Sequence, residues 1–163
     1  MIEENTLIAT VGLPRAGKST WIEKMHDAHG WPVAEVDAFR YALHGTHYNK
    51  QAEPLVWNHV RIAVRALFRG HHDVVMLDST MITEETRNKF ADENFQVVFK
   101  EFHTDKETCI ERAEITDQDY LVPVIERMSK VRDPLGVHDE HFEDWYELYQ
   151  NAESAYQEKA DSL

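Results

Sequence analysis

The chain has little of what marks secreted or membrane proteins. Its 163 residues include a single cysteine, Cys109, so no disulfide can form within the chain. No apolar run approaches the roughly 20 residues that span a bilayer, and the opening residues, MIEENTLIATVG, lack the basic and long apolar regions of a signal peptide. We therefore expect a cytoplasmic protein with no membrane contact.

Basic residues are also scarce. The chain has 17 Lys and Arg against 30 Asp and Glu, a net charge of −13. Between His138 and Leu163 lie 8 acidic residues and 1 Lys, so −7 of that charge belongs to the C-terminal segment. This balance argues against a broad basic surface that holds long nucleic acid, although it leaves room for a local basic pocket.

Short apolar segments alternate with amphipathic ones along the chain. The pattern predicts strands over residues 6–12, 33–36, 72–80 and 95–103. It predicts helices over residues 18–30, 38–43, 52–70, 83–94, 105–115, 121–131 and 141–159. We expect one α/β domain over residues 1–163, with a parallel sheet of about four strands, the second beside the first, and helices on both faces.

Residues 12–19, GLPRAGKS, match the phosphate-binding pattern G-x-x-x-x-G-K-[ST] in full, between a predicted strand and a predicted helix. Gly12 and Gly17 let the backbone curl so that its amides face the phosphates, and Lys18 places a charge between the β and γ phosphates. Ser19 offers a hydroxyl to Mg²⁺. We predict a P-loop NTPase or kinase fold that binds ATP and Mg²⁺ through Gly12, Arg15, Ala16, Gly17, Lys18, Ser19 and Thr20.

Two carboxylates follow predicted strands. Asp78 ends an apolar strand, where a P-loop protein usually keeps the carboxylate that orients Mg²⁺, although it could instead cap the next turn. Asp37 follows the second strand, so it should face the γ-phosphate, with Arg40 on the same helical side. Asp37 would accept a proton from an acceptor hydroxyl and Arg40 would hold an anion. In the alternative interpretation, Asp37 caps its helix and Arg40 is a surface cation.

The segments GLPRAGKSTW, EVDAFR, LDST and VPVIERM, in this order and spacing, resemble the kinase domain of phage-type polynucleotide 5′-kinases and the small P-loop kinases around it, over residues 6–135. The resemblance implies that Lys18 and Asp37 are catalytic, with Asp37 as general base for a 5′-hydroxyl. It implies that Arg40 binds the acceptor's neighbouring phosphate and that Asp78 lies near the acceptor. It would also fit a phage-encoded protein.

The same resemblance implies a helical lid over about residues 112–132. Arg127 would be its catalytic arginine, which bridges the donor phosphates and stabilises the transferring group, and Arg112 would mark its other end. Two departures concern this lid. Its segment AEITDQDYLVP is acidic where polynucleotide kinases carry further basic residues, and the spacing from Pro123 to Arg127 is one residue short.

These departures keep other acceptors and other activities open. Small-molecule and nucleotide-sugar kinases, including zeta-type toxin kinases, share the architecture, so the partner is a 5′-hydroxyl nucleic acid or a small phosphorylated alcohol. A non-kinase ATP-binding switch, in which Asp37 and Arg40 are incidental, is a further alternative. No phosphatase domain follows within the 163 residues, so we do not expect a bifunctional strand-end-repair enzyme.

Two surface patterns favour structural roles. Arg61, Arg65 and Arg69 form a stripe on one helix face that could receive a nucleic-acid backbone, but such stripes are more often solvated or paired with acids. The acidic C-terminal helix, about residues 139–160, carries an aromatic face. We expect this face to pack on the body, with self-association into a homo-oligomer as the alternative; it comprises Phe142, Trp145, Tyr146, Tyr149 and Ala152.

Overall fold

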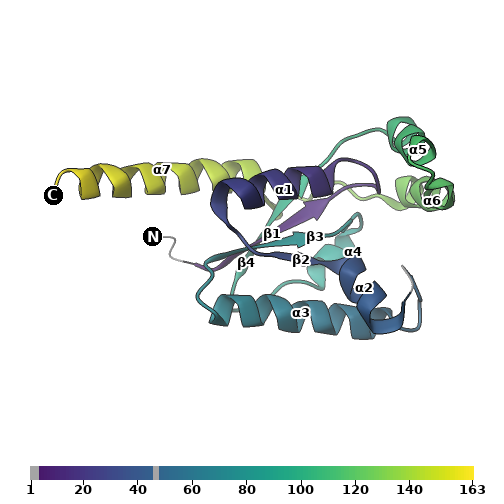
Figure 1. The fold of residues 1–163 in the computed structure, drawn as a ribbon, viewed down its shortest axis with the longest axis horizontal. Helices are drawn as coiled ribbons and strands as arrows, with labels where there is room; N and C mark the ends of the chain where they lie inside the picture. Colours follow the sequence, from purple (N-terminus) through teal and green to yellow (C-terminus); the bar gives the residue numbers. More distant parts are fainter. Residues whose placement is uncertain (1–3, 46–47) are drawn as a thin grey trace.

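A computed structural model describes residues 4–45 and 48–163 and contains one parallel sheet (Figure 1). Its strands are β1 (Thr6–Val11), β2 (Val33–Glu35), β3 (Val74–Asp78), β4 (Gln96–Glu101) and β5 (Glu140–His141). The predicted parallel α/β architecture is confirmed. The strand number differs from the four expected, because β5 adds a fifth strand of only 2 residues. So short a strand, with both residues exposed, leaves no apolar pattern in the sequence.

Helices cover both faces of the sheet (Figure 1). They are α1 (Lys18–His29), α2 (Val36–His44), α3 (Glu53–Arg69), α4 (Glu84–Asn88), α5 (Lys106–Ile115), α6 (Val122–Val131) and α7 (Phe142–Asp161), with a 3-10 turn at Asp119–Leu121. Side chains of β1 alternate between the two faces, since Leu7 packs with Val60 of α3 whereas Ile8 packs with Ile22 of α1 and Phe142 of α7. The sheet is therefore the middle of three layers. No helix in the described ranges is both long and apolar enough to cross a bilayer.

The strand order, β2-β3-β1-β4-β5, corrects one expectation. We expected the second strand beside the P-loop strand, but β3 lies between β2 and β1. Four of the five residues of β3 are buried, which suits the middle of a sheet, whereas β2 buries only Ala34 and lies at the edge. This order brings Asp78, rather than Asp37, next to the P-loop strand.

The helix after β3 is shorter than predicted. The sequence suggests a helix over residues 83–94, but α4 ends at Asn88. Phe90 is 2% exposed in the core beside α3, and Asp92 turns back to pair with Arg65. Tertiary packing of Phe90 and Asp92 thus replaces the last helical turns.

Helix α7 lies along the same face as α1 and then extends past the end of the sheet (Figure 1). Phe142 and Trp145 are buried, and Tyr146 and Tyr149 are half-buried against them. Ala152, which we placed toward the body, is exposed, as are all the residues that follow it. The aromatic face therefore packs within the chain, and the last turns of the helix extend beyond the surface that it covers.

Candidate active site

The P-loop begins where β1 ends and passes closely over its neighbours. The amide of Gly12 donates to the carbonyl of Thr80 at 2.9 Å, and a Cβ on Gly12 would lie 3.0 Å from the Cβ of Phe102. Gly17, just before α1, has φ of +102°, a conformation that side chains disfavour. A larger residue is therefore disfavoured at Gly12 by the close approach of Phe102, and at Gly17 by the backbone conformation.

Lys18 points into the loop. Its Nζ donates to the carbonyl oxygens of Gly12 at 3.0 Å and Leu13 at 2.5 Å. Burial lowers the pKa of Lys18 to about 8, while the charges of Asp78 and Asp37 act in the opposite direction. The ammonium is thus held by main-chain oxygens at the position where phosphate oxygens would compete for it.

Ser19 and Asp78 form the oxygen pair predicted for Mg²⁺. The hydroxyl of Ser19 donates to Oδ2 of Asp78 at 2.8 Å, although the two residues are 59 positions apart. Burial raises the pKa of Asp78, and the Ser19 hydrogen bond and the charge of Lys18 oppose that rise. A hydroxyl and a carboxylate at this separation are the hard oxygen donors that suit Mg²⁺, so the residues present fit the ion.

A buried hydroxyl pair, which sequence reasoning missed, ties β1 to the end of β3. Thr10 is fully buried, and its Oγ1 donates to the carbonyl of Ser79 at 2.9 Å and accepts from the Ser79 amide at 3.0 Å. Ser79 Oγ in turn donates to the carbonyl of Thr10 at 3.0 Å. Because Asp78 directly precedes Ser79, these hydrogen bonds also hold Asp78 beside the strand that leads into the P-loop. The available signal was a threonine among apolar residues near the end of this strand.

The helices of the predicted lid, α5 and α6, pack directly on the P-loop. Leu13 and Ala16 form one buried cluster with Cys109 and Ala113 of α5 and Ile125 of α6. The cluster makes Cys109 a core residue, and burial raises the pKa of its thiol.

The two predicted lid arginines differ in their contacts. Nη1 of Arg112 donates to the carbonyl of Arg15 at 3.1 Å, so this end of the lid touches the loop. Arg127 is exposed on α6 and makes no hydrogen bond or ion pair with the residues that the structure describes. Thr20, at the start of α1, is exposed as well.

Asp37 and Arg40 lie together at the start of α2. Helix α2 begins at Val36 with Glu35 as its N-cap, so Asp37 is in the first turn and does not cap the helix. Arg40 Nη1 donates to Asp37 Oδ1 at 2.8 Å, and Arg40 Nε donates to Oε1 of Glu53 in α3, also at 2.8 Å. Burial acts against the charge of Arg40, but the hydrogen bonds to Glu53 and Asp37 raise the pKa of Arg40 above its ordinary value. Glu53, 13 positions from Arg40, had no sequence signal for this pairing.

Glu35 is a further carboxylate at this end of the sheet. It ends β2 opposite Asp78 in β3, and sequence reasoning did not single it out. Loss of solvent and the charges of Asp78 and Asp37 raise the pKa of Glu35. The carboxyl ends of β2 and β3 therefore carry a run of mutually repelling acids next to the P-loop.

The arginine stripe on α3 is largely used within the chain. Arg65 pairs with Asp92 at 2.6 Å, and Arg61 donates to the carbonyl of Lys89 and lies 3.9 Å from the same Asp92. Only Arg69 of the three lacks an ion pair within the described residues. The structural interpretation of the stripe therefore fits better than a nucleic-acid surface.

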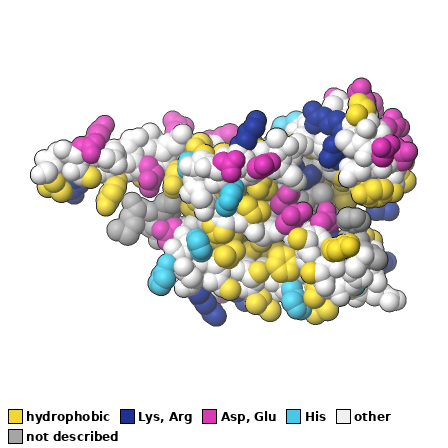
Figure 2. Space-filling view, viewed as in Figure 1, with side chains coloured by type: hydrophobic (Ala, Val, Ile, Leu, Met, Phe, Trp, Pro, Cys, Tyr) yellow, Lys and Arg dark blue, Asp and Glu magenta, His cyan; other side chains and the backbone are white. Residues whose placement is uncertain are grey.

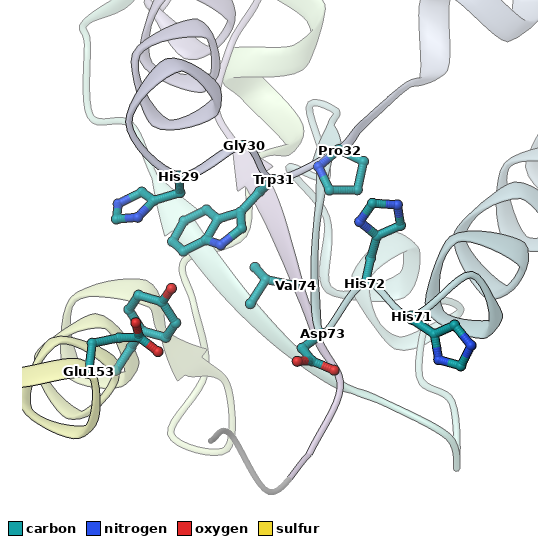
Figure 3. Close-up of a pocket in the computed structure, with 10 residues that line it drawn as sticks. His29, Gly30, Trp31, Pro32, His71, His72, Asp73, Val74 and Glu153 are labelled. Atoms are coloured by element: carbon teal, nitrogen blue, oxygen red, sulfur yellow. The ribbon is translucent and has the colours of Figure 1, made fainter. Parts of the chain in front are cut away.

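The surface of the predicted lid carries more acidic than basic side chains. Figure 2 shows acidic side chains over α5 and α6, with Lys and Arg side chains beside them. A cavity of about 240 Å³ lies at the opposite end of the sheet, beneath Trp31 and between Asp73 and Glu153 (Figure 3). That end carries the amino ends of the strands, whereas open parallel sheets bind ligands at the carboxyl ends. The P-loop end is therefore the candidate active site.

Comparison with known proteins agrees with this geometry. A family model described as an AAA domain matches residues 7–135. No curated protein sequence matches the chain. In fold, the chain is similar to a gluconokinase from Sinorhizobium meliloti 1021, with a TM-score of 0.61 and 18% identity over 84% of this chain and 81% of that one.

Two further solved structures share the fold. A sugar kinase from Janibacter sp. HTCC2649 has a TM-score of 0.65 and 14% identity, over 85% of this chain and 83% of that one. A chain of the Pnkp1/Rnl/Hen1 complex has a TM-score of 0.61 and 23% identity, over 69% of this chain but only 40% of that one. At these identities the likenesses show the fold alone.

Proposed function

Because this chain belongs to the AAA domain family and carries a complete P-loop beside an exposed carboxylate, we propose that it is an ATP- and Mg²⁺-dependent kinase that transfers the γ-phosphate to an alcohol. The observation that carries the proposal is the position of Asp37. Its side chain is 61% exposed, and its charge acts on both Lys18 and Asp78. A carboxylate so close to the donor groups, yet open to solvent, can receive the proton of an acceptor hydroxyl.

Each residue has a defined role in the proposed reaction. Asp37 accepts the hydroxyl proton as the acceptor oxygen attacks the γ-phosphorus in line, and the bond to the bridging oxygen of ADP breaks. Lys18 leaves the carbonyls of Gly12 and Leu13 and binds the phosphates. Mg²⁺, held by Ser19 and Asp78, would neutralise charge that develops on the phosphates.

The lid arginines complete the donor side in this proposal. Arg112 keeps the loop against α5, and Arg127 swings from solvent onto the donor phosphates, where a cation stabilises the transition state. The aromatic face of α7, which is the alternative surface for self-association, packs on the sheet within the chain. A homo-oligomer through the C-terminal helix stays a prediction.

Two acceptor classes follow from different observations. The order of the sequence motifs, with Arg40 three positions after Asp37, supports the 5′-hydroxyl of a nucleotide or polynucleotide. The acidic lid, and the pairing of Arg61 and Arg65 with Asp92, support a small-molecule alcohol, since both remove positive surface that a polynucleotide would need.

An acceptor panel tests the proposal. The enzyme is incubated with γ-labelled ATP, Mg²⁺ and 5′-hydroxyl oligonucleotides, nucleosides, nucleotide sugars, sugars and polyols. We expect label in at least one alcohol. Slow ATP hydrolysis with no labelled acceptor would instead support a nucleotide switch and overturn the kinase proposal.

The role of Asp37 is tested with the same assay. We expect Asp37→Asn to lower transfer roughly a hundredfold or more, with ATP binding almost unchanged by calorimetry. Asp27→Asn, at an exposed aspartate near the end of α1, is the matched control. If Asp37→Asn loses ATP binding together with transfer, Asp37 is not the base.

A further inference from the structure

Arg40 is held between two carboxylates that come from two helices. Nη1 contacts Asp37 within α2, and Nε contacts Glu53 at the start of α3. The Arg40 side chain is 18% exposed and that of Glu53 is 15% exposed, whereas Asp37 is 61% exposed. The guanidinium therefore connects a largely buried carboxylate to an accessible one.

Glu53 depends on Arg40 as its charge partner among the described residues. Its Oε1 accepts from Arg40, and its Oε2 is buried with no hydrogen-bond partner in the same part of the chain. If Arg40 left Glu53 to bind an anion on an acceptor, the remaining carboxylate would be largely buried and unpaired, which is strongly unfavourable. Arg40 therefore stays paired with Glu53.

The charge around Asp37 also disfavours an anionic acceptor. Two carboxylates, Asp37 and Glu53, face the single positive charge of Arg40. Glu35 and Asp78 lie close enough to Asp37 for their charges to interact with it. The charge of Lys18 also interacts with Asp37, but in the proposed reaction Lys18 is occupied by the phosphates of ATP. A phosphate placed beside the reacting hydroxyl would therefore meet net negative charge at short range.

We propose that the acceptor is an uncharged alcohol with no phosphate beside the reacting hydroxyl, and that Arg40 positions Asp37 instead of binding the substrate. This inference rests on the proposed kinase activity and names its substrate class: a neutral sugar, polyol or nucleoside. Arg40 holds Oδ1 of Asp37, so the other carboxylate oxygen is available to the acceptor hydroxyl.

The proposed transfer needs only ATP and the acceptor alcohol as reactants. The acceptor oxygen forms a bond to the γ-phosphorus of ATP, and the bond from that phosphorus to the bridging oxygen breaks. The hydroxyl proton passes to Asp37, and ADP leaves with the electron pair of the broken bond.

Matched acceptor pairs test the inference. Nucleosides are compared with their 3′-monophosphates, and glycerol with glycerol 3-phosphate, using γ-labelled ATP. We expect kcat/KM for the neutral member to exceed that of its phosphorylated partner by at least about tenfold. A preference for the phosphorylated member, or for oligonucleotides, overturns the inference but leaves the kinase proposal standing. Label in no acceptor at all overturns both.

The Glu53→Gln variant tests whether the ion pair with Glu53 keeps Arg40 away from the acceptor. It removes one negative charge and keeps the shape of the side chain, so Arg40 becomes freer to meet an anion. We expect the preference for neutral over phosphorylated acceptors to fall about tenfold. Glu93→Gln, at an exposed glutamate before β4, is the control and should keep the wild-type preference. If the Glu53→Gln protein has a wild-type melting curve and the same preference for neutral acceptors, Glu53 does not keep Arg40 away from the acceptor.

The Arg40→Met variant separates positioning from binding. A positioning role predicts that kcat for a neutral acceptor falls about tenfold or more while KM stays within about twofold. A large rise in KM with little change in kcat would mean that Arg40 binds the acceptor, and it would overturn the inference. The acceptor pairs with wild-type enzyme decide the substrate class even if either variant fails to fold.

Discussion

The donor and acceptor sides of the candidate active site differ in how their functional groups are held. On the donor side, Lys18 is buried and bound by main-chain carbonyls of its own loop, so its position follows from backbone geometry. On the acceptor side, Arg40 joins Asp37 to Glu53 through side chains of α2 and α3. The comparison predicts that the backbone and one lysine recognise the phosphate donor, whereas acceptor choice depends on a few ion pairs that substitutions can alter one at a time.

The largest expected effect belongs to the donor side. We predict that Lys18→Met lowers phosphate transfer roughly a thousandfold, because it removes a charge that would stabilise the transferring group. Labelled-ATP assays measure the loss, and Lys24→Met, exposed on the same helix, is the control. If Lys18→Met retains transfer within tenfold of wild type, the donor side is not organised around this lysine.

A smaller effect is expected from the lid. We predict that Arg127→Ala lowers kcat roughly a hundredfold, with protein stability unchanged because the side chain is exposed. Lys130→Ala, also exposed on α6, controls for a general loss of positive charge from the lid. Equal effects of the two substitutions would show that the lid acts through its overall charge and that Arg127 has no specific role.

The burial of Lys18 also predicts how stability depends on pH. The pKa of Lys18 is about 8 in the folded chain, whereas its ordinary value in an unfolded chain is 10.5, so between these pH values the unfolded chain binds more protons. Burial of the charged lysine lowers the unfolding free energy by its full amount below pH 8, and this loss disappears as the pH rises toward 10.5. From pH 7 to pH 10, wild type should therefore gain about 2 kcal/mol of unfolding free energy relative to Lys18→Met.

Urea denaturation of wild type and Lys18→Met at each pH measures this gain, because groups that do not interact with Lys18 titrate alike in both proteins. A difference between the two proteins that stays constant with pH would mean that Lys18 is not desolvated in the folded chain. Lys18 would then resemble Asp37 on the acceptor side, whose carboxylate is open to solvent.

The smallest effect is expected on the outer surface of α3. Arg65 is 44% exposed, and its partner Asp92, whose side chain is 1% exposed, also accepts two hydrogen bonds from Asn94. We therefore expect Arg65→Gln to lower the unfolding free energy by only about 1 kcal/mol. Phosphate transfer should not change, and Arg69→Gln is the matched control on the same helix. A selective loss of transfer to oligonucleotides in Arg65→Gln would show that the stripe binds nucleic acid.

The sequence by itself determined the donor site and most of the elements that carry it. Gly12, Gly17, Lys18 and Ser19 are close in the chain, and their backbone geometry depends on local residue types, so the motif predicts the loop. Continuous apolar runs likewise predict β1, β3 and β4, because buried strands need them. The i, i+3 spacing was enough to bring Arg40 beside Asp37.

Only the tertiary structure decided the rest. The position of β3 between β2 and β1 depends on which strand is buried in the middle of the sheet. Helix α4 ends early because Phe90 packs in the core. The Arg40–Glu53 pair joins residues 13 positions apart on two helices, and its geometry exists only once α2 packs on α3. Contacts of this kind carry no local signature, because their energy depends on burial and distances that form when the whole chain folds.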